Sequence, residues 1–110
     1  MFDLLKMAGT YKARNVANFA KNDLVVDTSS VTDGYKPFES GITHPQYNQG
    51  KWIIVEDYGT KKEAQIGHDK WVAIMTNKKL PAQLVVSGGG DLNPQGKVYP
   101  RIVPAEKVTA

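Results

Sequence analysis

The chain has 110 residues, enough for one domain with one modest core and too few for a separate cofactor-binding domain. It contains no cysteine, which excludes disulfides, cysteine zinc sites and thiol nucleophiles, and its two histidines are too few to favour an all-histidine metal site. A net charge of +3 is too small to require a nucleic-acid partner, and a hydrophobic content of 41% excludes wholesale disorder.

The first residues do not have the charge order of a signal peptide, because Asp3 and Lys6 interrupt a short apolar run. No stretch approaches the ~18 apolar residues of a membrane span. We therefore expect a soluble protein that is made in the cytoplasm.

Two helices are predicted near the start. Residues 2–8 can form a short helix that Gly9 ends, and Thr10 can cap a second helix that ends at Asn22-Asp23. The second helix is predicted from small apolar residues whose spacing places them on one helix face. They are Ala13, Val16, Ala17 and Ala20. A stripe this narrow indicates close packing against a sheet.

Three segments have the composition of β-strands. Residues 24–31 are rich in β-branched residues, and residues 38–43 form a shorter strand. Residues 51–58 give the strongest strand pattern, and their centre is apolar on both faces. We therefore expect this third strand in the middle of the sheet.

The clearest helix is predicted from Thr60 to about Asn77. Thr60 and Glu63 have the spacing of a capping box, and Leu80-Pro81 prevents continuation. Its apolar face is Ala64, His68, Trp71, Val72 and Met75. The residues expected to pack together in the core are Trp52, Ile54, Trp71, Val72 and Met75.

The last part of the chain differs in kind. Residues 84–86 can add a strand, residues 87–90 are predicted to form a glycine-rich hinge, and the later prolines exclude a central strand. We therefore predict one domain over residues 1–87 and a Gly/Pro-rich extended arm over residues 88–110 that adds little to the fold. The residues predicted to bind a partner are Val98, Tyr99, Arg101, Ile102 and Val103.

Together these elements predict the α+β class, with a small antiparallel sheet packed by one long and one shorter helix and followed by the extended arm. The lysines do not form one basic stripe, because Lys61-Lys62 and Lys78-Lys79 lie at opposite ends of the long helix. A mixed, solvated surface is therefore the favoured interpretation.

No group of residues has the pattern of a catalytic, cofactor-binding or metal site. The triple glycine at residues 88–90 lacks the Gly-Lys-Ser/Thr ending of a phosphate-binding loop. His68 lies on the apolar helix face, which favours a core or interface histidine over a general base. His44 is expected to make a hydrogen bond that holds its own loop together.

Glu56 and Asp57 are neighbours on a strand, so their side chains point to opposite faces and cannot act as a carboxylate pair. Glu56 is predicted to share its strand face with Trp52, Ile54 and Tyr58. If that face is buried, the Glu56 carboxylate needs a partner such as a lysine or the Tyr58 hydroxyl.

Two motifs carry a resemblance to a known group of proteins. The segment Tyr47-Asn48-Gln49-Gly50-Lys51-Trp52 turns into a strand, and the segment Gly67-His68-Asp69-Lys70-Trp71-Val72 lies on the long helix. With these motifs, roughly residues 1–82 of the chain resemble small proteins of tailed bacteriophages that are usually left uncharacterised. The resemblance brings no catalytic residues with it.

This resemblance implies a non-enzymatic virion protein, such as a capsid decoration or minor capsid protein, at the capsid or the head–tail region. Its partners would be capsid or connector subunits, bound in many copies and partly through the arm, where weak sites gain from avidity. No cofactor, metal, small-molecule substrate or membrane partner is expected. The alternative is a non-virion phage protein that binds a host factor in the cytoplasm, and a third hypothesis is a small enzyme around His68 or His44.

Overall fold

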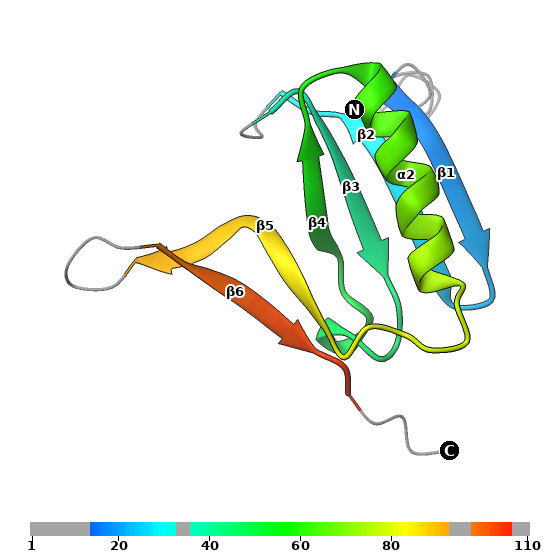
Figure 1. Cartoon of the computed structure of the whole chain (residues 1–110), viewed down its shortest axis with the longest axis vertical. Helices are drawn as coiled ribbons and strands as arrows, with labels where there is room; N and C mark the ends of the chain where they lie inside the picture. The colour runs from blue at the N-terminus through cyan, green and yellow to red at the C-terminus, as the bar shows by residue number, and fades with distance from the viewer. Residues whose placement is uncertain (1–13, 33–35, 93–97, 107–110) are drawn as a thin grey trace, which may run out of the picture.

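A computed structural model describes residues 14–32, 36–92 and 98–106 (Figure 1). The elements in chain order are β1 (Asn15–Lys21), β2 (Leu24–Ser30), β3 (Phe38–Thr43), the 3-10 turn η1 (Asn48–Gly50), β4 (Ile53–Tyr58), α2 (Lys61–Met75), β5 (Gln83–Leu92) and β6 (Val98–Pro104).

The first four strands form an antiparallel meander in the order β1-β2-β3-β4. Helix α2 lies across one face of this sheet, and β5 and β6 form a separate two-stranded sheet that projects beside β4 (Figure 1). The fold is therefore α+β, as predicted. Strands over residues 24–30 and 38–43 and the long helix after Thr60 are also confirmed.

The helix predicted after Thr10 is wrong over residues 15–21, which form β1. Phe19 pairs with the buried Val26 and packs against the core, whereas Ala20 is exposed, which is the alternation of a strand. Asn22, with a φ of 54°, lies in the two-residue turn between β1 and β2. Strand pairing through this turn overrides the weak helical pattern of small residues.

The remainder of that predicted helix, and the short helix predicted over residues 2–8, lie outside the described residues.

β4 is the edge strand of the meander, so the prediction of a central position is wrong. Its two apolar faces have different surroundings. Ile53 and Val55 are buried in the core, whereas Trp52 is 55% exposed and stands with Ile54 against Gly41 on the sheet face away from α2. The predicted packing of Trp52 and Ile54 with the helix face is therefore also wrong.

Helix α2 begins as predicted. The Thr60 side chain accepts a hydrogen bond from the Glu63 backbone N–H at 3.1 Å, which satisfies one of the free donors of the first turn. Ala64, His68 and Met75 are buried against the sheet, and Trp71 and Val72 pack against the core while half-buried. The predicted apolar face of the helix is thus confirmed.

Gly67 allows α2 to approach the sheet closely. A Cβ atom at this position would overlap the ring and hydroxyl of Tyr58, which is itself buried. A side chain here would force the helix away from β4.

The β5–β6 hairpin contributes residues to the hydrophobic core. Leu84 of β5 and Val103 of β6 are cross-strand partners, and both belong to the buried core. Two backbone hydrogen bonds hold the base of the hairpin. The Ala105 N–H donates to the Ala82 carbonyl at 2.8 Å, and the Glu106 N–H donates to the carbonyl of Gln46, in the loop between β3 and β4, at 2.6 Å. The description of residues 88–110 as an arm outside the core is therefore not confirmed, since Val103 fills a core position.

The predicted hinge at residues 87–90 lies inside β5. Here the ladder is irregular, because residues 87–90 stand opposite residue 100 alone. The Ser87 hydroxyl donates to the Asp57 carboxylate, which ties this part of β5 to β4. The glycine run therefore interrupts the pairing with β6 without ending the strand.

The contact between Gly67 and Tyr58 gives a direct prediction. Gly67→Ala should lower the free energy of unfolding by about 1–3 kcal/mol, although alanine is the better helix former by ~1 kcal/mol. Chemical denaturation measures the change. Gln65→Ala, at an exposed position of the same helix, should not destabilise, and Tyr58→Val should relieve the penalty of Gly67→Ala. A Gly67→Ala variant more stable than the parent would contradict the packing.

The position of Val103 gives a second prediction. Val103→Ala should lower the free energy of unfolding by about 1–2 kcal/mol, because it removes buried methyl groups. Ile102→Ala, at the neighbouring exposed position, should change it by less than about 0.5 kcal/mol. Truncation after Ser87 should destabilise the domain more than either substitution. Equal stability of all variants would show that β6 is not part of the core.

Candidate functional site

The residues predicted to bind a partner fall on β6, and the structure separates them. Val103 is buried and unavailable to a partner, whereas Arg101 and Ile102 are exposed. Val98 and Tyr99 lie in the strand, opposite Leu92 and Asp91, but their side chains lie outside the described part.

The hairpin has two unlike faces. Leu84 and Val103 form the cross-strand pair that enters the core, and the next pair, Val85 and Ile102, points the other way. Val85 is 47% exposed and Ile102 is 48% exposed. Two half-exposed apolar side chains that pair directly across a sheet form a continuous apolar patch.

The outer edge of β6 is poorly suited to strand addition. Because the Ala105 N–H points toward Ala82 of the β5 side, alternation directs the backbone groups of residues 98, 100, 102 and 104 outward. Pro100 and Pro104 have no N–H, so half of the donors on that edge are missing. This edge therefore offers few backbone donors to an added strand.

His68 is buried and takes part in a chain of hydrogen bonds between helix and sheet. Its Nδ1 lies 2.9 Å from the Thr28 hydroxyl, which shares a 2.5 Å hydrogen bond with the Ser40 hydroxyl. The Tyr58 hydroxyl donates to Ser40 at 3.0 Å. A consistent set of protons therefore runs from Tyr58 through Ser40 and Thr28 to His68 Nδ1.

This chain has the character of a core network. Thr28 and Ser40 have no exposed surface and His68 is 5% exposed, so a substrate cannot reach the hydroxyls. Burial lowers the pKa of His68 against the opposing effect of Asp69 and Asp27. Burial also raises the pKa of Tyr58 to about 12. The predicted core histidine is confirmed, and the neutral ring satisfies the buried hydroxyls.

Glu56 faces α2, whereas Trp52 and Ile54 lie on the other face of the sheet, so the prediction that the three share one face is wrong. The register shift opposite Ser40 and Gly41 changes the alternation at this point of β4.

The Glu56 carboxylate has the partners that the sequence requires. One carboxylate oxygen accepts from the Lys70 ammonium at 2.6 Å and from the Trp71 indole N–H at 3.0 Å. Burial alone would raise the pKa of Glu56, but the hydrogen bonds from Lys70 and Trp71, together with the charge of Lys70, outweigh it and lower the pKa. The group ties the middle of α2 to the edge strand.

His44 lies in the loop between β3 and β4, and the expected hydrogen bond within the loop is present. The Gln46 N–H donates to His44 Nδ1 at 3.1 Å, and the His44 ring packs edge-on against Tyr47. Tyr47 has no exposed surface, and its hydroxyl donates to the Pro81 carbonyl at 2.5 Å. The loop is thereby fixed to the start of the hairpin.

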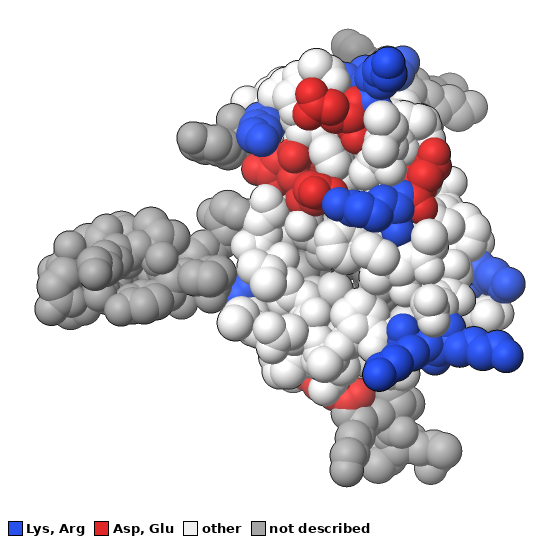
Figure 2. Space-filling model, in the orientation of Figure 1, with Lys and Arg blue, Asp and Glu red and all other residues white. Residues whose placement is uncertain are grey.

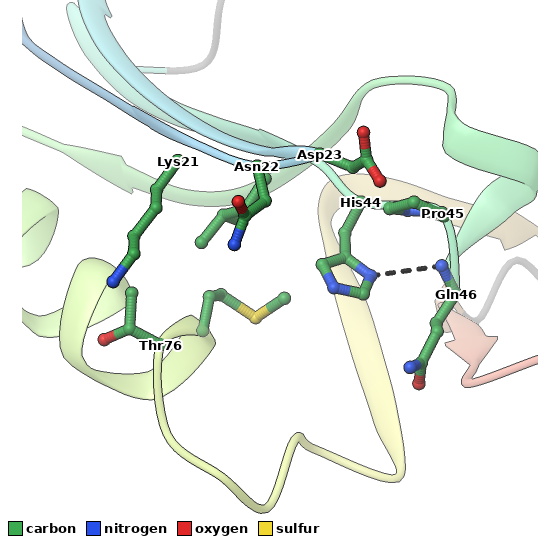
Figure 3. A pocket seen from close by; sticks show the side chains of 9 residues that line it. Lys21, Asn22, Asp23, His44, Pro45, Gln46 and Thr76 are labelled. Carbon is green, nitrogen blue, oxygen red and sulfur yellow. Dashed lines mark hydrogen bonds between the residues drawn. The ribbon is translucent and has the colours of Figure 1, made fainter.

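A pocket of about 450 Å³ opens beside His44 (Figure 3). It lies between the β1–β2 turn, the β3–β4 loop and the end of α2, and it is lined by Lys21, Asn22, Asp23, Leu24, His44, Pro45, Gln46, Met75 and Thr76. The sequence does not predict this pocket, because its residues come from three separate segments and the pattern around Lys21 predicts a helix instead of a strand.

On the face shown in Figure 2, acidic and basic side chains are interspersed beside α2, and basic side chains gather at its C-terminal end. The predicted mixed surface is present on this face. The described residues contain no group of three acidic or histidine side chains that could hold a metal ion. No helix in the described ranges is long and apolar enough to cross a membrane.

Comparison of the chain with protein-family models, curated proteins and solved structures finds no match. The resemblance to tailed-phage proteins therefore stays a prediction, and the candidate sites rest on their own geometry.

The buried state of His68 predicts an acid-sensitive fold. Folding lowers the pKa of His68 below its ordinary value of 6.5, so the unfolded chain takes up the proton first. The contribution of His68 to the free energy of unfolding should be fully present above pH 6.5. It should be lost as the pH falls toward the lower pKa that His68 has in the folded state. Melting temperatures measured from about pH 8 to about pH 5 should show this decline.

His68→Gln keeps a neutral hydrogen-bonding group and should flatten part of the decline. Burial lowers the pKa of His44 as well, so His44→Gln is the matched comparison. An unchanged pH profile in His68→Gln would mean that His68 does not titrate with folding.

Proposed function

We propose that this chain is a non-enzymatic virion protein of a tailed bacteriophage, a capsid decoration or head–tail protein that binds neighbouring subunits. The resemblance of its two motifs to small tailed-phage proteins supports the phage assignment. The observation that carries the binding role is the paired, half-exposed Val85 and Ile102 on a hairpin whose other face is fixed in the core.

The proposed binding element is a folded hairpin and not a loose arm. An arm would have to be ordered on binding, at ~1 kcal/mol or more per residue in backbone entropy. The hairpin base is already held by Tyr47, Gln46 and Val103, so its apolar face is presented before the partner arrives. Preorganisation of this kind lets a small apolar contact contribute to affinity, and many copies on one particle add avidity.

The motifs themselves serve the fold under this proposal. In the first, Tyr47 anchors the loop, and Gln49 and Gly50 adopt positive φ values of 57° and 78° at its turn. In the second, Gly67 makes room for Tyr58 and His68 bonds Thr28. A protein whose motifs hold a surface in place suits a structural role.

Mass spectrometry of purified particles of the phage that encodes the chain tests the proposal. We expect the protein in stoichiometric amounts. Absence from particles would overturn the virion assignment and favour the alternative, a phage protein that binds a host factor in the cytoplasm.

The binding face is tested by substitution. Val85→Glu and Ile102→Glu should each change the free energy of unfolding by less than about 0.5 kcal/mol and should strongly reduce incorporation into particles. Ile66→Glu is the matched control, because Ile66 is 62% exposed on α2 and lies off the hairpin. Equal loss with the control, or normal incorporation of both hairpin variants, would contradict a role for this face.

A further inference from the structure

A second hollow, of about 240 Å³, lies on the face of the meander away from α2. Its described lining comes from Arg14 and from residues in or next to β2, β3 and β4. Gly41 of β3 pairs with Asp27 of β2 on one side and with Ile54 of β4 on the other. Because paired residues share a face of the sheet, the missing side chain of Gly41 leaves space between Asp27 and Ile54.

Trp52 supplies an aromatic wall to this hollow. A Cβ atom added at Gly41 would lie 3.2 Å from Cε3 of the indole, so the glycine lets the ring stand close to the sheet. The Asn48 side-chain amide donates to the Trp52 carbonyl at 3.3 Å and holds the backbone here. Trp52 ends the first motif but lies outside the hydrophobic core, and it is 55% exposed. Its indole therefore offers apolar surface on which a ligand can stack.

The β2 side of the hollow is polar and held in place. One oxygen of the Asp27 carboxylate accepts from the side-chain amides of Asn15 at 2.8 Å and Asn18 at 2.9 Å. The other oxygen accepts from the Ser29 hydroxyl at 3.0 Å. A carboxylate has about four lone-pair sites, so these bonds fix its position without using its full capacity as an acceptor.

The charges around the hollow favour a neutral ligand. Among the described lining residues, Arg14 carries a positive charge and Asp27 and Glu39 carry negative charges. A cation would be repelled by the guanidinium, and an anion would be repelled by the two carboxylates. The same groups supply both donors and acceptors of hydrogen bonds, to which the Ser29 hydroxyl adds one of each. Hydroxyl groups on a neutral ligand match this mixed set, because they also donate and accept.

We propose that this hollow binds one neutral sugar ring, which stacks its C–H face on Trp52 and directs its hydroxyls to Arg14, Asp27 and Glu39. A pyranose with equatorial hydroxyls has a flat C–H face and a polar rim, so both sides of the hollow find a counterpart. Its C–H groups carry a partial positive charge that suits the negative face of an indole. The volume lies below the ~300 Å³ at which sites for drug-sized ligands begin, which fits a single ring. The proposal does not depend on the virion role.

NMR of the full chain tests the proposal, with methyl β-D-glucopyranoside as the probe. We expect saturable shifts of the Trp52 indole N–H and of the Asp27, Glu39 and Gly41 amides, with a Kd on the order of 1–10 mM. The Trp71 indole N–H, which bonds Glu56 on the helix side of the sheet, is the internal control and should not shift. Non-saturating shifts at Trp52, or equal shifts of both indoles, would overturn the proposal.

Two further probes separate stacking of a sugar from other binding. Sorbitol has the hydroxyls of a sugar without a ring, and tetramethylammonium is a cation that aromatic side chains attract. Neither should cause saturable shifts at Trp52. Binding of either probe as tight as that of the glucoside would contradict a site for a sugar ring.

Substitutions locate the site. Trp52→Ala should weaken glucoside binding at least about tenfold, because it removes the stacking surface, and Trp52→Phe should weaken it less. Ile66→Ala is the matched control, since Ile66 is an apolar residue that is 62% exposed on α2, and it should leave the affinity unchanged. Melting curves confirm that each variant is folded. Unchanged affinity in folded Trp52→Ala, or equal loss in Ile66→Ala, would overturn the proposal.

Discussion

The buried side chain of Tyr47 connects the parts of this structure that the sequence keeps apart. Its ring has no exposed surface and packs edge-on with His44, and its hydroxyl donates to the Pro81 carbonyl at 2.5 Å. One residue thereby fixes the loop between β3 and β4 to the connection between α2 and β5. The Gln46–Glu106 and Ala82–Ala105 hydrogen bonds extend this junction to the end of β6.

The hairpin face and the pocket beside His44 both depend on that junction. On one side it holds the β5–β6 hairpin, so that Val103 is buried and Ile102 is presented to solvent. On the other side it positions His44, whose Nδ1 is occupied by Gln46 and whose other nitrogen faces the pocket. The hairpin face and the pocket are thus both positioned by the same buried group.

The sequence predicts the elements that have a strong local signal. The capping box at Thr60 and Glu63 places α2, and the β-branched run after Leu24 places β2. It does not predict β1, because small residues such as Ala17 satisfy a helix face and a strand equally well, and pairing with β2 decides between them. The sequence also predicts that residues 88–110 lie outside the core, because their prolines exclude a central strand. Prolines are compatible with a two-stranded hairpin, which is the structure that β5 and β6 form.

The account is tested most directly by hydrogen exchange in Tyr47→Phe, which keeps the ring and removes the hydroxyl that bonds Pro81. The loss of this buried hydrogen bond is expected to cost about 1–3 kcal/mol and to act locally. Exchange of the Val103, Ala105 and Glu106 amides should accelerate markedly, while the amides in the middle of α2 keep their protection. Unchanged exchange in the hairpin, or equal acceleration in α2, would show that Tyr47 does not fix the hairpin to the domain.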